Sequence, residues 1–228
     1  MLSKSKIWYL ENFNLFEGLK PDKMMELDRK MSMNNIKRNQ IIYFADEPSN
    51  SIFLLKEGQV KLSRVSEDGR EAIIAILKPG EIFGELAITG ETNREDSAIA
   101  MDEAVICTIS KENFEMLLMD NPKLNLKIIK IIGLKLQKVE RGLENMIFKD
   151  SYSRINYFLV NYAKDYGKKI GDEIFIKSSL THQDIASLTA TSRQTVTTAM
   201  NKLKDKKIID FTRNRIIIRD LNKLQKSI

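Results

Sequence analysis

The chain has 228 residues, 43% of them hydrophobic and 30% charged, which is ordinary for a protein that buries cores and long enough for two domains. Its longest apolar runs, residues 72–77 and 128–134, are far shorter than the ~18 residues that suggest a membrane span, and no apolar signal segment follows the first lysines. We therefore expect no membrane association and a location in the reducing cytoplasm. A single cysteine, Cys107, and a single histidine, His182, exclude intrachain disulfides, iron–sulfur clusters and multi-histidine metal sites.

The net charge of +6 is unevenly distributed. Residues 1–149 carry 22 Lys and Arg against 23 Asp and Glu, whereas residues 150–228 carry 15 against 8. A basic C-terminal third attached to a neutral body indicates that this end meets a polyanion. Because lysine-rich surfaces are common, the inference needs a motif to support it.

The N-terminal segment, residues 1–32, is expected to form short helices, because apolar residues recur there at helical spacing on both sides of Pro21: Trp8, Leu10, Phe13, Leu15, Phe16, then Met24, Leu27 and Met31. From residue 36 to residue 109 the pattern changes to short β-branched segments separated by turns, with predicted strands at residues 41–44, 52–56, 60–65, 72–77 and 105–109. Several short strands at near-regular spacing predict a compact β-barrel or β-roll. Cys107 is expected to be a small buried thiol in the last of these strands.

A long helix is predicted to start at Asn121 and Pro122. Apolar residues recur in it three or four positions apart over about six turns: Leu124, Ile128, Ile132, Leu136, Val139, Leu143 and Met146. The alternative is a helix packed only on its own β-roll, and some of these residues are expected to pack there. The length and narrowness of the seam favour a two-fold dimer interface made by Ile132, Leu136, Val139, Leu143 and Met146.

After residue 150 come an amphipathic helix, a polar loop around residues 167–172 and a short strand at residues 174–176. Thr181 and Asp184 then have the spacing of a capping box, in which a hydroxyl and an acid three residues later satisfy the first backbone N–H groups of a helix. A turn at residues 189–191 precedes a second helix, capped by Thr191 or Ser192, whose inner face carries Val196, Ala199, Met200 and Leu203. This arrangement is typical of a helix-turn-helix, and residues 208–211 and 215–219 predict a basic β-hairpin wing after it.

The outward face of the second helix is expected to read DNA. Arg193 can pair bidentately with guanine and Gln194 with adenine, while Thr197 and Thr198 suit phosphate or a thymine methyl group. An isolated stretch of this kind is usually a solvated helix face, but a capping box, a turn, a basic helix and a basic wing in this order favour DNA binding. The predicted contact residues are Thr181, His182, Gln183, Ser192, Arg193, Gln194, Thr197 and Thr198. His182 is interpreted as a surface or phosphate-contacting residue, neither catalytic nor metal-binding.

The chain resembles the cyclic-AMP receptor protein (CRP/FNR) family over nearly its whole length. The resemblance rests on Gly58, Gly69 and Gly80, on Phe83-Gly84-Glu85-Leu86-Ala87 and Ser97-Ala98, on the helix after Asn121-Pro122, and on residues 180–186 and 192–196. It implies an α+β fold with a cyclic-nucleotide-binding-like β-roll sensory domain (residues 1–120), a long dimerisation helix (121–149) and a C-terminal winged helix-turn-helix DNA-binding domain (150–228). It also implies a homodimer that regulates transcription from palindromic double-stranded DNA, with residues 164–172 as the segment that would touch RNA polymerase.

The same resemblance implies an effector pocket formed by Gly84, Glu85, Leu86, Arg94, Ser97, Ala98, Val139 and Glu140. Family members that bind cyclic nucleotides have an arginine immediately before the Ser-Ala pair, and here Asp96 stands in that place, where its charge would repel a phosphate. Val139 and Glu140 replace hydroxyl residues that contact adenine. Cyclic AMP is therefore disfavoured, no cofactor is assigned, and the class of any small-molecule or nucleotide effector is left open.

In the reading helix, Arg193 matches the family's guanine-reading arginine, whereas Gln194 and Thr198 replace a common glutamate and a common arginine. The predicted target keeps a guanine in each half-site but departs from TGTGA. Ala190 stands where the turn often has glycine, and alanine at a positive φ would cost of the order of 1 kcal/mol. The alternative function is a cyclic-nucleotide-binding module that acts on a protein partner. An enzyme is not expected, because the sequence shows no nucleophile–base pair, metal-ligand cluster or P-loop.

Overall fold

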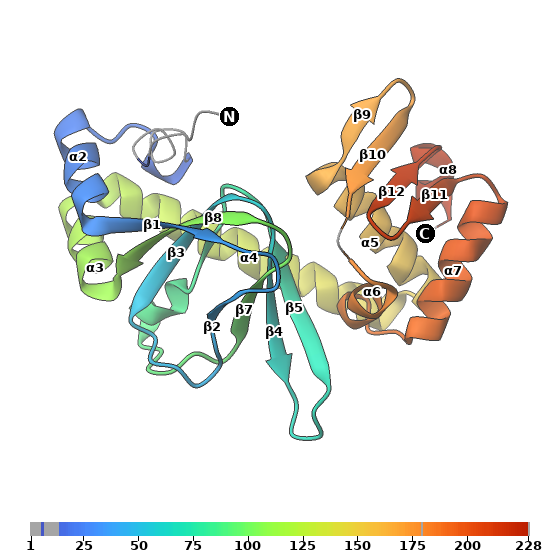
Figure 1. The fold of residues 1–228 in the computed structure, drawn as a ribbon, viewed down its shortest axis with the longest axis horizontal. Helices are drawn as coiled ribbons and strands as arrows, with labels where there is room; N and C mark the ends of the chain where they lie inside the picture. The colour runs from blue at the N-terminus through green and yellow to red at the C-terminus, as the bar shows by residue number, and fades with distance from the viewer. Residues whose placement is uncertain (1–5, 7–13, 179, 228) are drawn as a thin grey trace. The chain divides into compact units, whose positions relative to one another are not determined.

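The computed structural model describes residue 6, residues 14–178 and residues 180–227, and these form two compact units (Figure 1). The first unit takes the chain up to residue 65 together with residues 74–136, and the second takes residues 66–73 and 137–228. The first is a β-roll with helices and the second a winged helix-turn-helix, so the predicted α+β class is confirmed. Within the described residues, no helix is long and apolar enough to cross a membrane.

The β-roll consists of two four-stranded sheets. One has the order β1-β8-β3-β6 and contains β1 (Met31–Ile36), β3 (Ser51–Glu57), β6 (Ile82–Phe83) and β8 (Ala104–Ser110). The other has the order β2-β7-β4-β5 and contains β2 (Ile41–Tyr43), β4 (Val60–Val65), β5 (Glu71–Leu77) and β7 (Ser97–Ala100). All five predicted strands are present. The sequence missed β1, β6 and β7, because β1 is rich in Ser and Asn and the other two are only two and four residues long.

Met31 corrects the expectation for the N-terminal helices. It does not end a helix but begins β1, where it pairs with Ile109 of β8. The helix before it stops at Lys30, and Met31 already has an extended backbone with φ −107° and ψ 145°. Trp8, Leu10 and Phe13 lie outside the described residues, whereas Leu15 and Phe16 are buried in the core.

Strand β3 shows how the core is layered, because both of its faces are covered. Phe53 and Leu55 point between the two sheets, where Phe53 stacks on Phe83 with 5.1 Å between ring centroids. Ile52 and Leu54 point the other way, into a cluster shared with the helices. The two-residue period of a strand therefore distributes one continuous apolar run over two cores.

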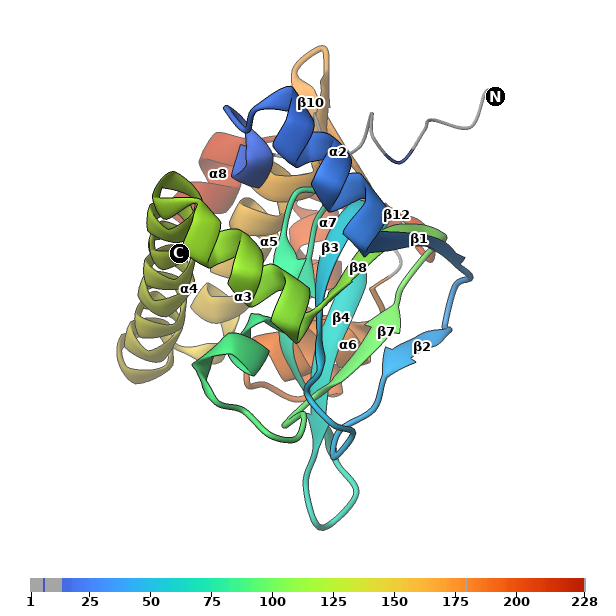
Figure 2. The ribbon, with the colours of Figure 1, turned by 90° about the vertical axis from the view of Figure 1, so that its left-hand side faces the viewer.

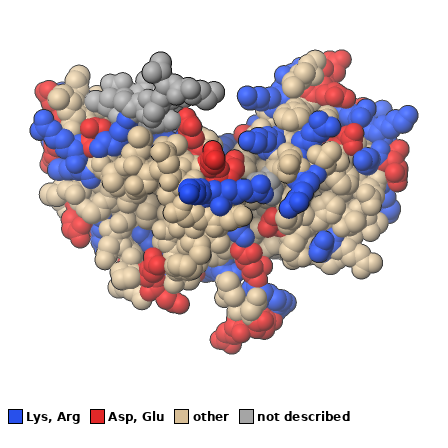
Figure 3. All heavy atoms as spheres, in the orientation of Figure 1, with Lys and Arg blue, Asp and Glu red and all other residues tan. Residues whose placement is uncertain are grey.

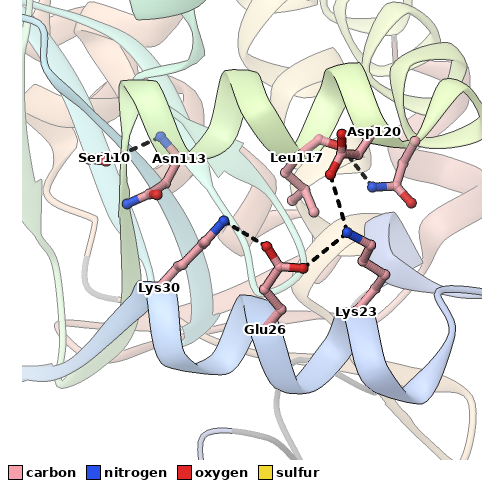
Figure 4. Close-up of polar contacts among 8 residues, drawn as sticks. Lys23, Glu26, Lys30, Ser110, Asn113, Leu117 and Asp120 are labelled. Carbon is pink, nitrogen blue, oxygen red and sulfur yellow. Dashed lines mark hydrogen bonds and ion pairs between the residues drawn. The ribbon is translucent and has the colours of Figure 1, made fainter.

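Helices cover the outer face of the β1-β8-β3-β6 sheet. They are η1 (Asn14–Phe16), α2 (Pro21–Lys30), η2 (Glu85–Thr89) and α3 (Lys111–Asp120), and Figure 2 shows α2 and α3 over the strands. Lys23 of α2 bridges Glu26 of its own helix and Asp120 of α3, with Nζ–O distances of 3.0 and 3.2 Å (Figure 4). Lys30 pairs with the same Glu26 at 2.7 Å. Hydrogen bonds from these two lysines lower the pKa of Glu26 to about 2.

The long helix α4 (Pro122–Phe148) is one continuous element, and its residues belong to both compact units (Figure 1). Leu124 and Ile128 are each only 3% exposed, because they pack in the β-roll core. Further along, Leu136, Val139 and similar residues are more than half exposed. The predicted seam is therefore divided: its first two members pack on their own β-roll, Ile132 packs partly there, and the members from Leu136 onward are exposed.

The second unit contains a four-stranded sheet and four shorter helices. Its sheet has the order β11-β12-β10-β9, formed by β9 (Lys168–Ile170), β10 (Glu173–Lys177), β11 (Ile209–Thr212) and β12 (Arg215–Ile218). The helices are α5 (Ser151–Tyr166), α6 (His182–Leu188), α7 (Arg193–Asp205) and α8 (Leu221–Lys226). The stretch expected as a polar loop around residues 167–172 holds β9 and turns through Gly171, whose φ is +61°. Helix α8 was not expected; Asp220 caps it by accepting from the Lys223 amide.

Candidate nucleic-acid interface and β-roll cassette

Helix α6 begins with the predicted capping box. The Thr181 hydroxyl accepts a hydrogen bond from the Asp184 amide at 3.1 Å, and the Asp184 carboxylate accepts one from the Thr181 amide at 2.7 Å. Both side chains are thereby used to fix the start of the helix. On its inner face, Ile185 and Ala186 are 1% exposed.

The turn between α6 and α7 is a Schellman motif. The Thr191 amide donates to the Ala186 carbonyl oxygen at 2.9 Å, and the Ala190 amide donates to the Ser187 carbonyl oxygen at 3.3 Å. This pattern places Ala190 in the left-handed region with φ +49°, a position that usually holds glycine. Ala190 therefore has the positive φ considered in the sequence analysis, and alanine has the conformational cost expected there.

Helix α7 separates a buried face from an exposed one. Ser192 caps it by accepting from the Thr195 amide at 3.0 Å, which decides between the two predicted caps. The outer face at the start of α7 points to solvent, since Ser192, Arg193, Gln194 and Thr198 are all exposed. The inner face is buried as predicted, with exposures of 0 to 6%, at Val196, Ala199, Met200 and Leu203.

His182 and Thr197 differ from their expected surface roles. The Thr197 hydroxyl donates to the Arg193 carbonyl oxygen at 2.9 Å, so His182 Nδ1, 2.9 Å from the same hydroxyl, is its donor. The imidazole also lies 5.6 Å from the Phe211 ring. Burial, followed by the nearby charge of Arg193, lowers the pKa of His182. His182 is half-buried and ties α6 to α7 and to the wing, a role that its place beside the capping box did not indicate.

The wing strand β11 carries an acid that engages two of the predicted basic residues. Asp210 pairs with Lys204 of α7 and with Arg219, each at 3.2 Å, and the hydrogen bond from Lys204 is the main cause of the lowered pKa of Asp210. Besides Arg193, the exposed basic residues of α7 and the wing that appear in no described ion pair include Lys202, Lys206, Lys207, Arg213 and Arg215. Figure 3 shows Lys and Arg side chains spread over the visible face of the winged helix.

Arg154 is a structural residue of this unit that the sequence did not single out. From the first turn of α5 its Nε donates to the Thr189 carbonyl oxygen at 2.9 Å and its Nη2 to that of Ala190 at 3.0 Å. Its Nη1 reaches the Lys149 carbonyl oxygen at 3.1 Å. One guanidinium thus joins the segment after α4 to the turn of the helix-turn-helix. An arginine beside an N-cap aspartate, Asp150, was the only sequence signal, and it is not specific.

Residues 82–90, from β6 through η2, are called the cassette below. Side chains from other parts of the β-roll and from α4 make its polar contacts. Lys135 of α4 lies with Nζ 2.6 Å from Glu85 Oε1 and also donates to the Ile82 carbonyl oxygen at 2.8 Å. Gly84 precedes Glu85 with φ +70°, and a Cβ there would lie 2.8 Å from Arg94 Nη1 and 3.1 Å from the Ser51 carbonyl oxygen, so a larger residue would be strained and would displace Arg94. Leu86 is 46% exposed.

Arg94 is 3% exposed and lies beneath this cassette. Its Nη1 donates to the Gly84 carbonyl oxygen at 3.1 Å and its Nη2 to that of Ser51. Nη1 is also 3.6 Å from Glu91 Oε2, and the guanidinium lies 4.7 Å from the centroid of the Tyr43 ring. Its Nε is the only buried side-chain nitrogen or oxygen atom of the described residues that has no hydrogen-bond partner.

Asp96 and Ser97 are also engaged within the roll. The Tyr43 hydroxyl donates to Asp96 Oδ1 at 2.9 Å, and the Ser97 hydroxyl accepts from the Ala45 amide at 2.9 Å. Burial raises the pKa of Asp96. Ala98 is fully buried between the sheets. The structure therefore brings Gly84, Glu85, Arg94 and the Ser-Ala pair into one β-roll.

Comparison with known proteins accounts for both units. Residues 33–121 match the model of the cyclic nucleotide-binding domain, and residues 153–227 match that of the Crp-like helix-turn-helix domain. The global nitrogen regulator of Nostoc sp. is 31% identical over 82% of this chain and 84% of its own length. A CRP-like cAMP-activated global transcriptional regulator of Mycobacterium tuberculosis is 25% identical over 94% and 96%. A solved CooA mutant from Carboxydothermus hydrogenoformans superposes with a TM-score of 0.72 at 28% identity, covering 87% of this chain and 88% of that one. The chain belongs to the CRP/FNR family of transcription regulators.

Members of the CRP/FNR family act as transcription regulators rather than enzymes, and the helix-turn-helix of this chain is its DNA-binding domain. Two predicted pocket residues, Val139 and Glu140, are exposed on α4 and belong to the second compact unit.

Proposed function

We propose that this CRP/FNR regulator binds palindromic DNA as a homodimer and that the exposed start of α7 reads bases in the major groove. The observation that carries the proposal is the division of α7, whose inner face is buried while Arg193, Gln194 and Thr198 are exposed beside its N-terminus. The N-terminal residues of a recognition helix are those that reach base edges. Arg193 is assigned to a guanine and Gln194 to an adenine.

The basic side chains around α7 support phosphate contacts. Lys206, Lys207, Arg213 and Arg215 are exposed and flank the helix and the wing. Backbone contacts of this kind fix register without reading sequence. From the expected contact set, Thr181 and Gln183 remain exposed at the start of α6, whereas His182 and Thr197 act inside the domain.

The second copy is proposed to pack on α4. Apolar residues occupy the exposed side of this helix at spacings of three and four, the heptad pattern of a coiled coil. The fractional exposures include 62% at Ile129, 59% at both Leu136 and Val139, and 56% at Leu143. The exposed Ile129 is added in front of the predicted interface residues, and the proposed seam then contains Ile129, Ile132, Leu136, Val139, Leu143 and Met146.

Two further assignments rest on the family alone. Residues 164–172, which contain β9 and the turn after it, are proposed to contact RNA polymerase. Because its target is DNA, the regulator is proposed to act in the cytoplasm. The effector, if one is used, is proposed not to be cyclic AMP, since Asp96 stands at the arginine position and is held by Tyr43.

The proposal is tested by selecting bound duplexes from random oligonucleotides and measuring their affinity by fluorescence anisotropy at several salt concentrations. We expect a palindrome with a guanine in each half-site and an affinity that falls steeply with salt. Arg193→Ala should lose about 1–3 kcal/mol at that guanine and relax the preference there. Lys206→Ala is the matched control, because it should weaken all sequences equally and reduce the salt slope.

Two results would contradict the proposal. A uniform loss across all sequences for Arg193→Ala would remove its base-reading role. Failure of the wild-type chain to bind any duplex at low ionic strength would favour the alternative, a β-roll module that acts on a protein partner.

A further inference from the structure

We propose that Lys135 takes the place of an effector: by pairing with Glu85 it ties the cassette to the long helix, so that the DNA-binding form needs no cyclic nucleotide. The inference rests on the proposed function and specifies how the same β-roll is regulated. It assigns Lys135 a positioning role, because the residue acts on the cassette and not on DNA.

The first support is the burial of Glu85. This residue is only 8% exposed, and a carboxylate removed from water is costly unless it is paired and hydrogen-bonded. Lys135 supplies the partner with Nζ 2.6 Å from Oε1, and the same ammonium binds the Ile82 carbonyl oxygen at 2.8 Å. Both ends of the turn between β6 and η2 are therefore held from α4.

The second support is the position of Lys135 along α4. It follows the buried Ile128 by seven residues, so both side chains lie on the helix face that meets the β-roll. Ile131 and Ile132 pack partly on the same core. Lys135 is thus the last contact of α4 with the cassette before the exposed seam of Leu136 and Val139 begins.

The third support is the charge around the cassette. Glu85 pairs with Lys135 and Glu91 lies 3.6 Å from Arg94, while Asp96 accepts a hydrogen bond from Tyr43 and lies near the charges of Arg64, Glu91 and Arg94. Both Nη groups of Arg94 already bind main-chain carbonyl oxygens, so the guanidinium is held within the β-roll and its buried Nε has no hydrogen-bond partner. A cyclic phosphate would bring another negative charge close to the carboxylates of Glu85, Glu91 and Asp96, whose neighbouring bases are already engaged with them.

These observations define what the pair does. In an effector-dependent regulator, a ligand must favour one arrangement of the long helix over another by its own differential contacts. Here the Lys135–Glu85 pair makes that contact permanently. DNA binding is therefore expected to respond to the loss of Lys135 and not to added cyclic nucleotide.

The test uses the full chain and the selected duplex. Wild-type affinity is measured by anisotropy with and without millimolar cyclic AMP or cyclic GMP, and we expect no change beyond about twofold. Lys135→Met should lose at least about fivefold in affinity, and Lys135→Arg, which keeps the charge, should recover most of it. Lys130→Met is the matched control, because Lys130 is exposed on the same helix. The charge-exchanged double variant Glu85→Lys/Lys135→Glu should bind more tightly than either single variant.

A readout without DNA separates this inference from the proposed function. Amide hydrogen exchange of residues 82–90 should accelerate in Lys135→Met and remain unchanged in Lys130→Met. Accelerated exchange in a chain that binds no duplex would retain the Lys135 assignment and remove the proposed function. Wild-type affinity that rises tenfold with either nucleotide, or unchanged exchange and affinity in Lys135→Met, would overturn the inference.

Discussion

Replacing Ala190 with glycine should stabilise the helix-turn-helix. Ala190 has φ +49° at the left-handed position of the Schellman motif that ends α6. For a residue with a Cβ this conformation costs about 1–2 kcal/mol, because the Cβ approaches the following carbonyl oxygen. Glycine removes that cost and leaves the main-chain hydrogen bonds of the turn and of Arg154 in place.

The gain is smaller than the strain, because glycine also makes the unfolded chain more flexible by about 0.4–1 kcal/mol. The net stabilisation should be about 0.5–1 kcal/mol. Lys207 ends α7 in the same way, with φ +57°, its amide on the Lys204 carbonyl oxygen and the Ile208 amide on that of Leu203. Lys207→Gly should therefore give a gain of similar size.

Amide hydrogen exchange of residues 181–205 in the full chain measures this effect without assuming that both units unfold together. Exchange through opening of the domain should slow by about two- to fivefold in Ala190→Gly. Gln194→Gly, placed in the helical part of α7, is the control and should accelerate exchange. Equal or faster exchange in Ala190→Gly would refute the argument, because it would mean that the positive φ stores no strain.

The remaining predictions concern three other sites. Arg154→Gln should lose most of the hydrogen bonds to the carbonyl oxygens of residues 149, 189 and 190, and should therefore lower the melting temperature and weaken DNA binding. Lys164→Gln on the same helix is the control and should change neither the melting temperature nor the affinity. Unchanged melting and affinity in Arg154→Gln would contradict the role of Arg154. Burial lowers the pKa of Lys56 to about 8 from its usual 10.5. Between these two pH values the folded state binds fewer protons than the unfolded chain, so the free energy of unfolding should rise with pH across that window. Lys56→Met should abolish this rise and be more stable than the wild-type chain by the order of 2 kcal/mol at pH 7. Urea denaturation measures both, and parallel pH profiles of the two chains would show that burying the Lys56 ammonium costs no stability. Leu143→Glu should convert the dimer to a monomer in analytical ultracentrifugation, and an intact dimer would place the interface elsewhere.

The sequence predicted those parts of the protein that depend on neighbours in the chain. The capping box of α6, the turn at Ala190 and the buried face of α7 each involve residues that lie close together in the chain, seven positions apart at most. The Ser192 cap spans three positions, and the wing strands pair residues up to nine positions apart. Such hydrogen bonds and apolar periodicities form wherever the local pattern occurs, so they can be read before the packing is known.

One local reading was nevertheless wrong, and one choice of helix face was beyond the sequence, both for identifiable reasons. Met31 has the spacing of a helix residue, but its pairing with Ile109 draws it into β1. Ile128 and Ile129 are adjacent and equally apolar, and only the direction of α4 on the β-roll decides that the first is 3% exposed and the second 62%. A one-residue difference in phase cannot be derived from apolar spacing alone.

What the amino-acid sequence determined by itself was the family, the α+β fold and the two helices of the helix-turn-helix, because these follow from local patterns and matched motifs. What only the tertiary structure decided was which distant side chains meet. Lys135 and Glu85 are 50 positions apart, Tyr43 and Asp96 are 53 apart, and Arg154 and Ala190 are 36 apart. Each of these contacts depends on the register of strands or on the packing of one element against another, and a charge or hydroxyl in the sequence carries no information about its partner at that range.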